Sequence, residues 1–358
     1  MAPRRLRPFG ALIVLALLAL VAGSGTGAAR SESPIVWAHG MHAWVAAPSG
    51  SFSSARLAQS AVTWRGGPLT ASTGEAFRVF VSESLPLETS TPEGWAEFIA
   101  GLTHGPEITL LTAYIATLDE VQEICGARAL GCYGRNQMIA PGDATFTGVT
   151  AEEIVRHEYG HHIAFHRSNA PWLAIDWGPK RWASTASVCP RVSRREAYPG
   201  DQGGNYSQNP GEAWAETYRL MDERKAGITT ATWPIITPSF YPTEEALQAA
   251  EADVLQPWTS STTSRFGRTF GARTPRVWWI PLATPLEGER RVSVTVPSTC
   301  THDVALVSAN RRTVLKRGQW VGQRVKRLTT TVCGQRSHFI RITQRGALGR
   351  VAVTATRP

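Results

Sequence analysis

Hydrophobic and polar positions along this chain follow two periods, and each period marks different segments. Arg78–Ser82 alternates apolar and polar residues, which predicts a half-buried strand. Gln137–Ala140 is a short apolar run that a proline and a glycine end, and it predicts another strand. Between them, Thr91–Leu102 has a proline in its first turn, which is typical of a helix. The first two thirds of the chain therefore predict mixed helix and sheet.

Three further helices begin at recognisable cap residues. Thr150 stands three residues before Glu153, the spacing of a capping box, and an amphipathic segment follows. Asn209 precedes Pro210, an order typical of an N-cap and the first helical position. A third helix begins at Thr243, which two glutamates follow.

After residue 285 the pattern changes to short strands separated by turns. The segments either alternate or are rich in β-branched residues, and they are Arg290–Val296, Asp303–Val307, Leu328–Val332, His338–Thr343 and Val351–Thr354. They predict a small all-β sandwich. The fold class is therefore α+β, and we divide the chain into residues 1–29 (signal peptide), 30–76 (N-terminal extension or possible pro-segment), 77–258 (α+β domain), 259–284 (linker) and 285–358 (β-sandwich domain).

Residues 1–29 have the composition of a secretory signal peptide. Three arginines precede the apolar segment Ala11–Ala22, and small residues follow it up to Ala29. We expect cleavage after Ala29 and a secreted, extracellular or cell-surface protein with no membrane span in the mature form; an uncleaved membrane anchor is the alternative. The 42% hydrophobic and 18% charged residues exclude a disordered chain.

Charge is distributed unevenly along the 358 residues. Residues 285–358 hold fourteen Lys/Arg and three Asp/Glu, a net +11, whereas residues 31–284 hold nineteen and twenty-five, a net −6. This asymmetry predicts an anionic partner for the basic module, either a cell-surface polymer or an anionic lipid. A solvated basic surface with no partner is the alternative, and no nucleic-acid partner is expected.

The five cysteines fit an oxidising compartment. Cys125 and Cys132 flank a short loop and could pair, and so could Cys300 and Cys333 in the strand-rich tail. Cys189 would then be free or paired with one of the first two. Sequence alone leaves this connectivity open.

The strongest chemical signal is His157-Glu158-Tyr159-Gly160-His161, an H-E-x-x-H motif on the helix predicted after Thr150. Residues i and i+4 share a helix face, so both imidazoles can reach one metal ion. Zinc accepts imidazole nitrogen, and a catalytic site adds a third protein ligand and a water. Two ordinary helical histidines are the alternative.

Several residues compete for the place of the third ligand. Ala164 and Arg167 stand where a metzincin has glycine and histidine, so that class is excluded. Glu212 and Glu216 again lie four residues apart on one predicted helix, where one carboxylate can bind metal and the other can orient a ligating histidine. Asp201 is the alternative ligand, and a solvated acidic face is the alternative to both roles.

The two motifs H-E-Y-G-H and G-E-A-W-A-E resemble the gluzincin metallopeptidases whose third ligand is the first glutamate of an E-x-x-A-E helix, most closely the lethal-factor-type catalytic domain. The resemblance covers about residues 150–225, about a fifth of the chain. It implies a zincin-like catalytic domain over 77–258, Zn²⁺ as cofactor, and His157, His161 and Glu212 as ligands. It also implies that Glu158 is the general base and that Glu216 supports a ligand.

Further expectations follow from this resemblance. Tyr206 matches a tyrosine that stabilises the oxyanion. Gln137–Ala140 would be the edge strand that pairs with an extended protein or peptide substrate. The sequence thus predicts a secreted zinc-dependent endopeptidase that uses a zinc-activated water. The alternative is a secreted surface or wall-binding protein whose zinc site is structural or degenerate.

Overall fold

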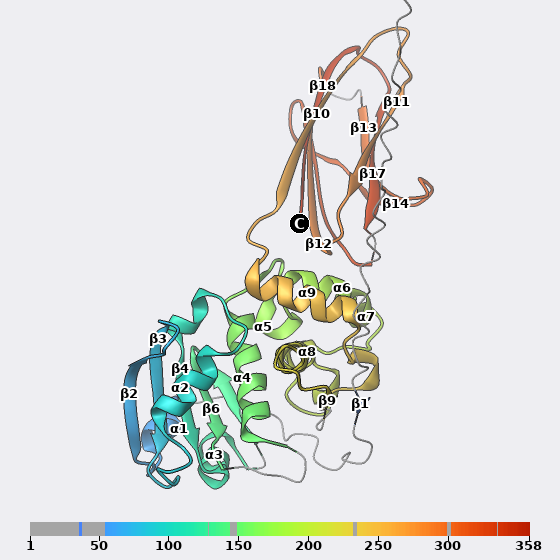
Figure 1. The fold of residues 1–358 in the computed structure, drawn as a ribbon. Helices are drawn as coiled ribbons and strands as arrows, with labels where there is room; N and C mark the ends of the chain where they lie inside the picture. Colours follow the sequence, from blue (N-terminus) through green and yellow to red (C-terminus); the bar gives the residue numbers. More distant parts are fainter. Residues whose placement is uncertain are drawn as a thin grey trace, which may run out of the picture. The chain divides into compact units, whose positions relative to one another are not determined.

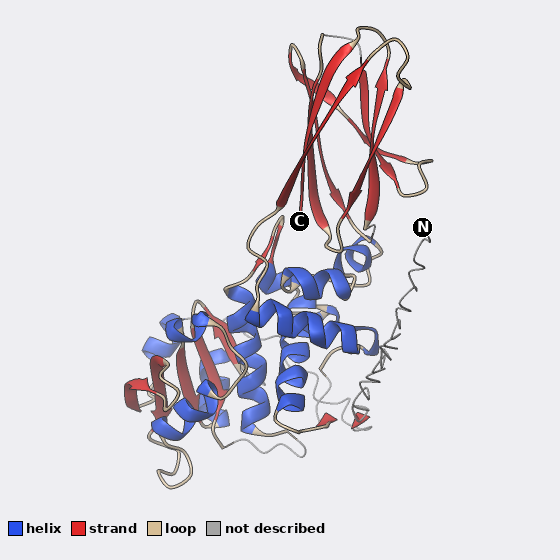
Figure 2. Cartoon of the chain, turned by 45° about the horizontal axis from the view of Figure 1, so that its top comes forward, coloured by secondary structure: helices blue, strands red, loops and turns tan. Residues whose placement is uncertain are grey.

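The computed structural model describes residues 36–37, 54–127, 129–143, 149–231, 235–298, 302–334 and 336–358. The predicted signal peptide, Cys300 and most of the predicted extension before residue 54 lie outside them. The described residues contain both helices and several sheets, so the predicted α+β class is confirmed (Figure 2). Among these described helices, none has the length and apolar character needed to cross a bilayer.

The first sheet is five-stranded and mixed. Its spatial order is β2 (Trp64–Thr70), β3 (Ala76–Ser82), β4 (Thr112–Ala116), β6 (Gln137–Pro141) and β5 (Cys132–Gly134). The three middle strands are parallel, and each outer strand is antiparallel to its neighbour. Residues 64–70, expected in an N-terminal extension, therefore belong to this sheet, and the boundary expected at residue 77 falls inside β3.

The prediction that Gln137–Ala140 is the edge strand is wrong. This segment, β6, lies between β4 and β5, and β5 forms the edge. The reason is a tight hairpin in which Arg135 and Asn136 both have positive φ, of 47° and 69°. Two-residue hairpin turns need this backbone, but they usually carry glycine. The Arg-Asn pair hides the hairpin from sequence reasoning.

Helices occupy the remainder of the first two thirds of the chain. They are α1 (Ser54–Gln59), α2 (Pro92–Ala100), α3 (Leu118–Cys125), α4 (Ala151–Phe165), α5 (Ala174–Trp177), α6 (Lys180–Thr185), α7 (Val188–Ser193), α8 (Pro210–Lys225) and α9 (Glu244–Leu255), with 3₁₀ turns at Pro106–Leu110, Tyr206–Gln208 and Pro238–Phe240. The predicted caps at Thr150, Asn209 and Thr243 are confirmed, and at Thr150 both capping-box hydrogen bonds are present. Two short strand pairs complete this region: β1 (Val36–Trp37) with β9 (Thr230–Ala231), and β7 (Ser168–Asn169) with β8 (Trp172–Leu173).

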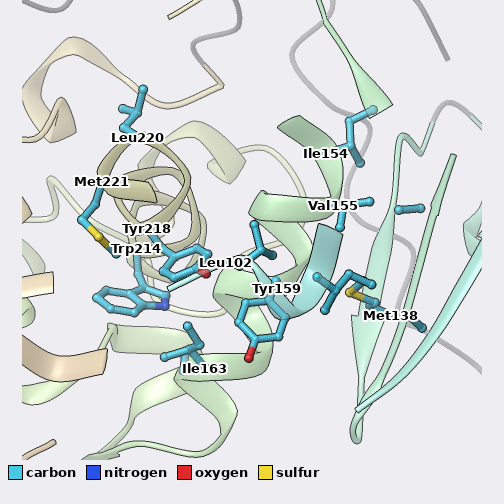
Figure 3. Close-up of a cluster of buried hydrophobic side chains, with 14 of the residues drawn as sticks. Leu102, Met138, Ile154, Val155, Tyr159, Ile163, Trp214, Tyr218, Leu220 and Met221 are labelled. Carbon is cyan, nitrogen blue, oxygen red and sulfur yellow. The ribbon is translucent and has the colours of Figure 1, made fainter. Parts of the chain in front are cut away.

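Helix α4 lies between the sheet and α8 (Figure 1). Its residues Tyr159 and Ile163 are fully buried, as are Trp214 and Tyr218 of α8 and Met138 of β6. Figure 3 shows these side chains meeting in one apolar cluster. Because α4 is covered on both sides, nearly all of its residues are buried, including every polar one except Glu152. Burial of this kind is costly unless polar groups have partners.

The C-terminal region is a sandwich of two antiparallel sheets. One has the order β10 (Thr262–Phe270), β18 (Gly349–Arg357), β12 (Gly288–Thr295), β16 (Val325–Val332) and β15 (Gln319–Gly322); the other has β11 (Val277–Ala283), β17 (Ser337–Gln344), β13 (His302–Ser308) and β14 (Val314–Arg317). All five predicted strands are present. Apolar residues of both sheets share one buried cluster.

Residues 259–284, expected to form a linker, instead contribute β10 and β11 to this sandwich. In β10 Phe270 is buried and Phe266 is partly buried, while Thr263, Arg265 and Thr269 on the opposite face are exposed. A strand at the edge of a sheet buries little, so its composition resembles that of a loop.

The cysteine pairing differs from one of the pairs considered. Cys125 bonds Cys132, as the short loop allowed, but Cys333 bonds Cys189 rather than Cys300. The bond joins α7 to the segment that follows β16. Two cysteines 144 residues apart in sequence meet only through the tertiary fold.

Removal of the Cys189–Cys333 bond by a double change to serine should lower the free energy of unfolding by about 2–4 kcal/mol, because the bond closes a long loop in the unfolded chain. The same change at Cys125 and Cys132, only seven residues apart, is the control and should cost less. Denaturant unfolding measures both. Equal losses would contradict the prediction, and a peptide map containing a Cys300–Cys333 bond would contradict the pairing.

Candidate metal centre

Three of the residues singled out in the sequence meet at the contact between α4 and α8. One ligand atom from each of His157, His161 and Glu212 lies within 4.8 Å of the others, and all three residues are buried. The Nε2 atoms of both histidines are 3.3 Å from the same oxygen, Glu212 Oε2. Two imidazole nitrogens and a carboxylate oxygen therefore converge on one point and could hold a metal ion.

The convergence depends on close approach of two helix backbones. A Cβ on Gly160 would lie 2.9 Å from Ala215 Cα and 3.1 Å from Ala215 O, closer than packed carbons tolerate. Trp214 Nε1 also donates to the Gly160 carbonyl oxygen at 2.8 Å. Glycine at position 160 therefore lets α8 come near enough for Glu212 to reach the histidines of α4.

Glu216 contacts the other nitrogen of a ligand histidine. Its Oε2 is 3.5 Å from His157 Nδ1, so a carboxylate one turn along α8 faces the imidazole from the opposite side to Glu212. Arg219 holds this carboxylate in turn, at 2.5 Å from Nη2 to Oε1 and 3.0 Å from Nε to Oε2. Such carboxylate–histidine contacts orient the ring and fix its tautomer.

Arg219 serves more than one carboxylate. Its Nη1 also donates to both oxygens of Glu223, at 2.7 and 2.9 Å, and lies 3.4 Å from Glu153 Oε1. The guanidinium is fully buried, and burial would be prohibitive without these partners. Glu153 is also the capping-box residue of α4, so the same network joins the start of α4 to the middle of α8.

Burial and charge set the protonation of these groups. Burial raises the pKa of the Glu216 carboxyl, but Arg219 and the hydrogen bond with His157 outweigh burial and lower this pKa below its usual value. Burial lowers the pKa of His157, yet Glu212 and Glu216 raise it to about 10. Burial raises the pKa of the Glu212 carboxyl, but the two histidines bring it well below its usual value. The pKa values of His157, Glu212 and Glu216 therefore depend on one another's charge.

Glu158 lies beside the ligands and lines a pocket of about 290 Å³ that also reaches His161 and Glu212. Burial raises the pKa of its carboxyl. A Cβ on Gly131 would lie 2.5 Å from Glu158 Oε1, so the absence of a side chain there leaves room for the carboxylate. Phe165, the last residue of α4, is exposed and lines the same pocket.

Tyr206 is buried next to the ligand group. Its hydroxyl donates to Glu212 Oε2 at 2.7 Å, and burial raises its pKa well above the usual value. The other oxygen, Glu212 Oε1, accepts from Gln202 Nε2 at 3.0 Å. Asp201, the alternative ligand, instead accepts from Gly203 N and Asn205 Nδ2 and is not part of the cluster.

Histidines outside the ligand group fix the wall of the pocket. His162 Nε2 is 2.9 Å from Glu107 O, and its Nδ1 is 3.1 Å from the Tyr133 hydroxyl, which also accepts from Asn136 N. His166 Nε2 lies 2.6 Å from Asn136 Oδ1. Both histidines thus hold the β5–β6 hairpin against α4.

Sequence reasoning did not identify Arg219, Gly131, Gln202 and Tyr133. Arg219 had a usable signal, since it stands three residues after Glu216 on the same helix and could pair with it. Nothing in the local sequence marks Gly131, Gln202 or Tyr133, because each acts on a residue that is distant along the chain.

Comparisons with known proteins do not identify a family. No family model and no curated protein matches this chain. The solved structures that resemble it include the pre-peptidase C-terminal domain of collagenase from Bacillus anthracis (12% identity, 27% of this chain and 89% of that chain, TM-score 0.22). A second is PliG, a periplasmic inhibitor of g-type lysozyme from Aeromonas hydrophila (8% identity, 27% of this chain and 87% of that chain, TM-score 0.20). A third is the SPBc2 prophage-derived protein YomS (8% identity, 28% of this chain and 99% of that chain, TM-score 0.18). Similarity at this level indicates no function for the chain.

Substitution of Gly160 by alanine should push α8 away from α4. We expect the free energy of unfolding to fall by about 1–3 kcal/mol through overpacking, although alanine favours a helix more than glycine does. Divalent-metal binding, measured by calorimetry, should weaken because Glu212 moves with α8. Gly271→Ala adds a methyl group where no atom lies within 4 Å and should change stability by less than about 0.5 kcal/mol. Unchanged metal affinity in Gly160→Ala would show that the close approach is not required.

Proposed function

We propose that this protein is a secreted zinc-dependent endopeptidase of the gluzincin type, with a zincin-like catalytic domain. The observation that supports this most is the convergence of His157, His161 and Glu212, with the Glu158 carboxylate in the adjoining pocket. A structural metal cage needs only its ligands. A carboxylate that follows a ligand in sequence and lines an accessible pocket has instead the placement of a general base.

The donor set fits zinc. Two neutral imidazoles and one carboxylate are a common ligand set of catalytic zinc sites, which leave a further position for water. The three ligand atoms lie within 4.8 Å of one another, close enough to bind one ion. Glu216, supported by Arg219, faces the second nitrogen of His157 and would favour the tautomer that presents Nε2 to the metal.

Bound zinc would supply a Lewis acid for the scissile carbonyl and would lower the pKa of water towards neutrality. Glu158 would take the proton of the attacking water and pass it to the leaving amine. Its environment suits both steps, because a pKa raised by burial makes the carboxyl a stronger base than an exposed glutamate.

Tyr206 would act on the oxygen of the scissile carbonyl. Since burial keeps its hydroxyl protonated, the tyrosine can donate a hydrogen bond to negative charge that develops there. The same hydroxyl donates to Glu212 Oε2, which places it at the ligand group.

An extended peptide has a strand to pair with at this site. β5 is the edge of the five-stranded sheet, and its residues Tyr133 and Gly134 line the pocket together with Glu158. Main-chain pairing on an exposed edge binds peptides of varied sequence. This supports a protein or peptide substrate, and the two disulfides are compatible with secretion.

Glu158→Gln should retain bound zinc and lower the rate of peptide hydrolysis by about 10²–10⁴-fold, because the base is lost while the ligands remain. Glu152→Gln makes the same chemical change at an exposed position of α4 and should leave hydrolysis unchanged. Elemental analysis gives the zinc content, and a fluorogenic peptide library gives the rate.

In the same experiment Glu212→Gln should bind zinc more weakly than the wild type, since a carboxylate ligand is lost. Asp201→Asn should retain zinc, because the Asp201 carboxylate accepts from Gly203 and Asn205 of its own loop and, among the described residues, is not part of the ligand group. If zinc is retained in Glu212→Gln but lost in Asp201→Asn, the third ligand is Asp201 and not Glu212. Zinc without hydrolysis in the wild type would favour a binding protein with a structural site.

Tyr206→Phe should retain zinc and lower kcat by about 10-fold or more, with little change in KM, because the hydroxyl acts on the transition state. Tyr198→Phe is the control: its hydroxyl donates to Arg195 O, away from the ligand group. If the kcat of Tyr206→Phe equals that of the wild type, the Tyr206 hydroxyl does not take part in the mechanism.

A further inference from the structure

The β-sandwich carries a projecting hairpin that its core does not explain. Residues 316–327, here named the basic hairpin, include the end of β14, all of β15, the turn after it and the start of β16. All four residues of β15 are exposed. Since neighbouring residues of a strand point to opposite faces, neither face of β15 is covered by the protein. The strand also lies at the edge of its sheet.

Charge on the basic hairpin has one sign. Its twelve residues hold five cations and no Asp or Glu: Lys316, Arg317, Arg324, Lys326 and Arg327. No described carboxylate lies within ion-pair distance of any of the five. The carboxylate that acts on Lys326 and Arg317 through space is Asp303, which is already paired with Arg345. The hairpin therefore presents an excess of positive charge to solvent.

Two large apolar side chains stand among these cations. Trp320 is 38% exposed and Val321 is 52% exposed, and the register of the β15–β16 pair shifts between Trp320 and Gly322. Lys326 pairs with Trp320 across the hairpin, with Nζ 4.7 Å from the ring centroid. Exposed apolar side chains that lie next to each other and are rimmed by charged ones are typical of an interaction site.

We propose that the basic hairpin is a docking surface for a bilayer that contains anionic phospholipid. The cations face the lipid phosphates, and Trp320 and Val321 enter the boundary between headgroups and acyl chains. Tryptophan favours this boundary because its ring is apolar and its N–H is polar. Cationic side chains next to apolar ones are the combination that binds anionic membrane surfaces.

The apolar pair favours a bilayer over a soluble anionic polymer. A polyanion would attract the five cations, but it offers no apolar layer for Val321 and leaves the second face of β15 in water. A headgroup layer can surround a strand that is free on both faces. The inference is independent of the proposed peptidase activity, since it uses no residue of the metal centre.

The test is vesicle binding by the predicted mature chain, residues 30–358. Vesicles of phosphatidylcholine with about 30% phosphatidylglycerol should bind the protein, and pure phosphatidylcholine vesicles should not. Arg324→Gln with Arg327→Gln should lower the partition coefficient about 30-fold, since each cation near an anionic surface contributes about fivefold. Arg265→Gln with Arg350→Gln, which removes two exposed cations from the far strands β10 and β18 of the same sheet, is the matched control and should change the partition coefficient little.

A second pair of changes separates lipid from polymer. Trp320→Ser with Val321→Ser keeps every charge and should lower binding to anionic vesicles about 10-fold or more, while thermal unfolding confirms that the sandwich remains folded. Soluble poly(glycerol phosphate) is the comparison probe. The proposal is overturned if neither vesicle binds, or if the control pair lowers binding as much as the hairpin pair. It is also overturned if the polymer binds as tightly as the vesicles and the Trp320/Val321 variant binds both normally.

Discussion

Helices α4 and α8 can share a polar centre only because their backbones approach closely where Gly160 faces Ala215. Burial of the apolar cluster around Tyr159, Trp214 and Tyr218 stabilises the packing of the two helices (Figure 3). The absence of a side chain at residue 160 determines how closely their backbones approach. At that separation, residues four apart on one helix face residues four apart on the other. The metal-ligand geometry is thus a consequence of helix packing.

The same packing forces many charged groups out of water, and the surrounding structure reflects the need to compensate them. Glu153, Glu212, Glu216 and Glu223 are all buried. Arg219 satisfies three of them, and the two histidines face the fourth. Removal of one partner from such a network leaves an uncompensated buried charge, which costs far more than an exposed ion pair contributes. The network therefore ties the stability of the helix pair to the position of Glu216, and through it to His157.

The part of the pocket wall formed by the β5–β6 hairpin depends on a different set of contacts. The β5–β6 hairpin is held by the Cys125–Cys132 bond at one end and by the His162–Tyr133–Asn136 contacts at the other. This arrangement makes β5 the free edge next to Glu158, whereas the more apolar β6 is enclosed. Apolar content marks how deeply a strand is buried, and an edge strand buries least. A short apolar run such as Gln137–Ala140 therefore indicates an enclosed strand and not the edge of the sheet.

Features that depend on neighbouring residues could be predicted from the amino-acid sequence. These are the caps of α4, α8 and α9, five strands of the sandwich, and the pairs His157/His161 and Glu212/Glu216, because helical spacing alone puts each pair on one face. The three-dimensional fold was needed to establish which helix faces meet, which cysteine bonds Cys189, and which groups surround Glu158. Those contacts join residues tens of positions apart, and they arise from packing, burial and charge compensation that no local pattern records.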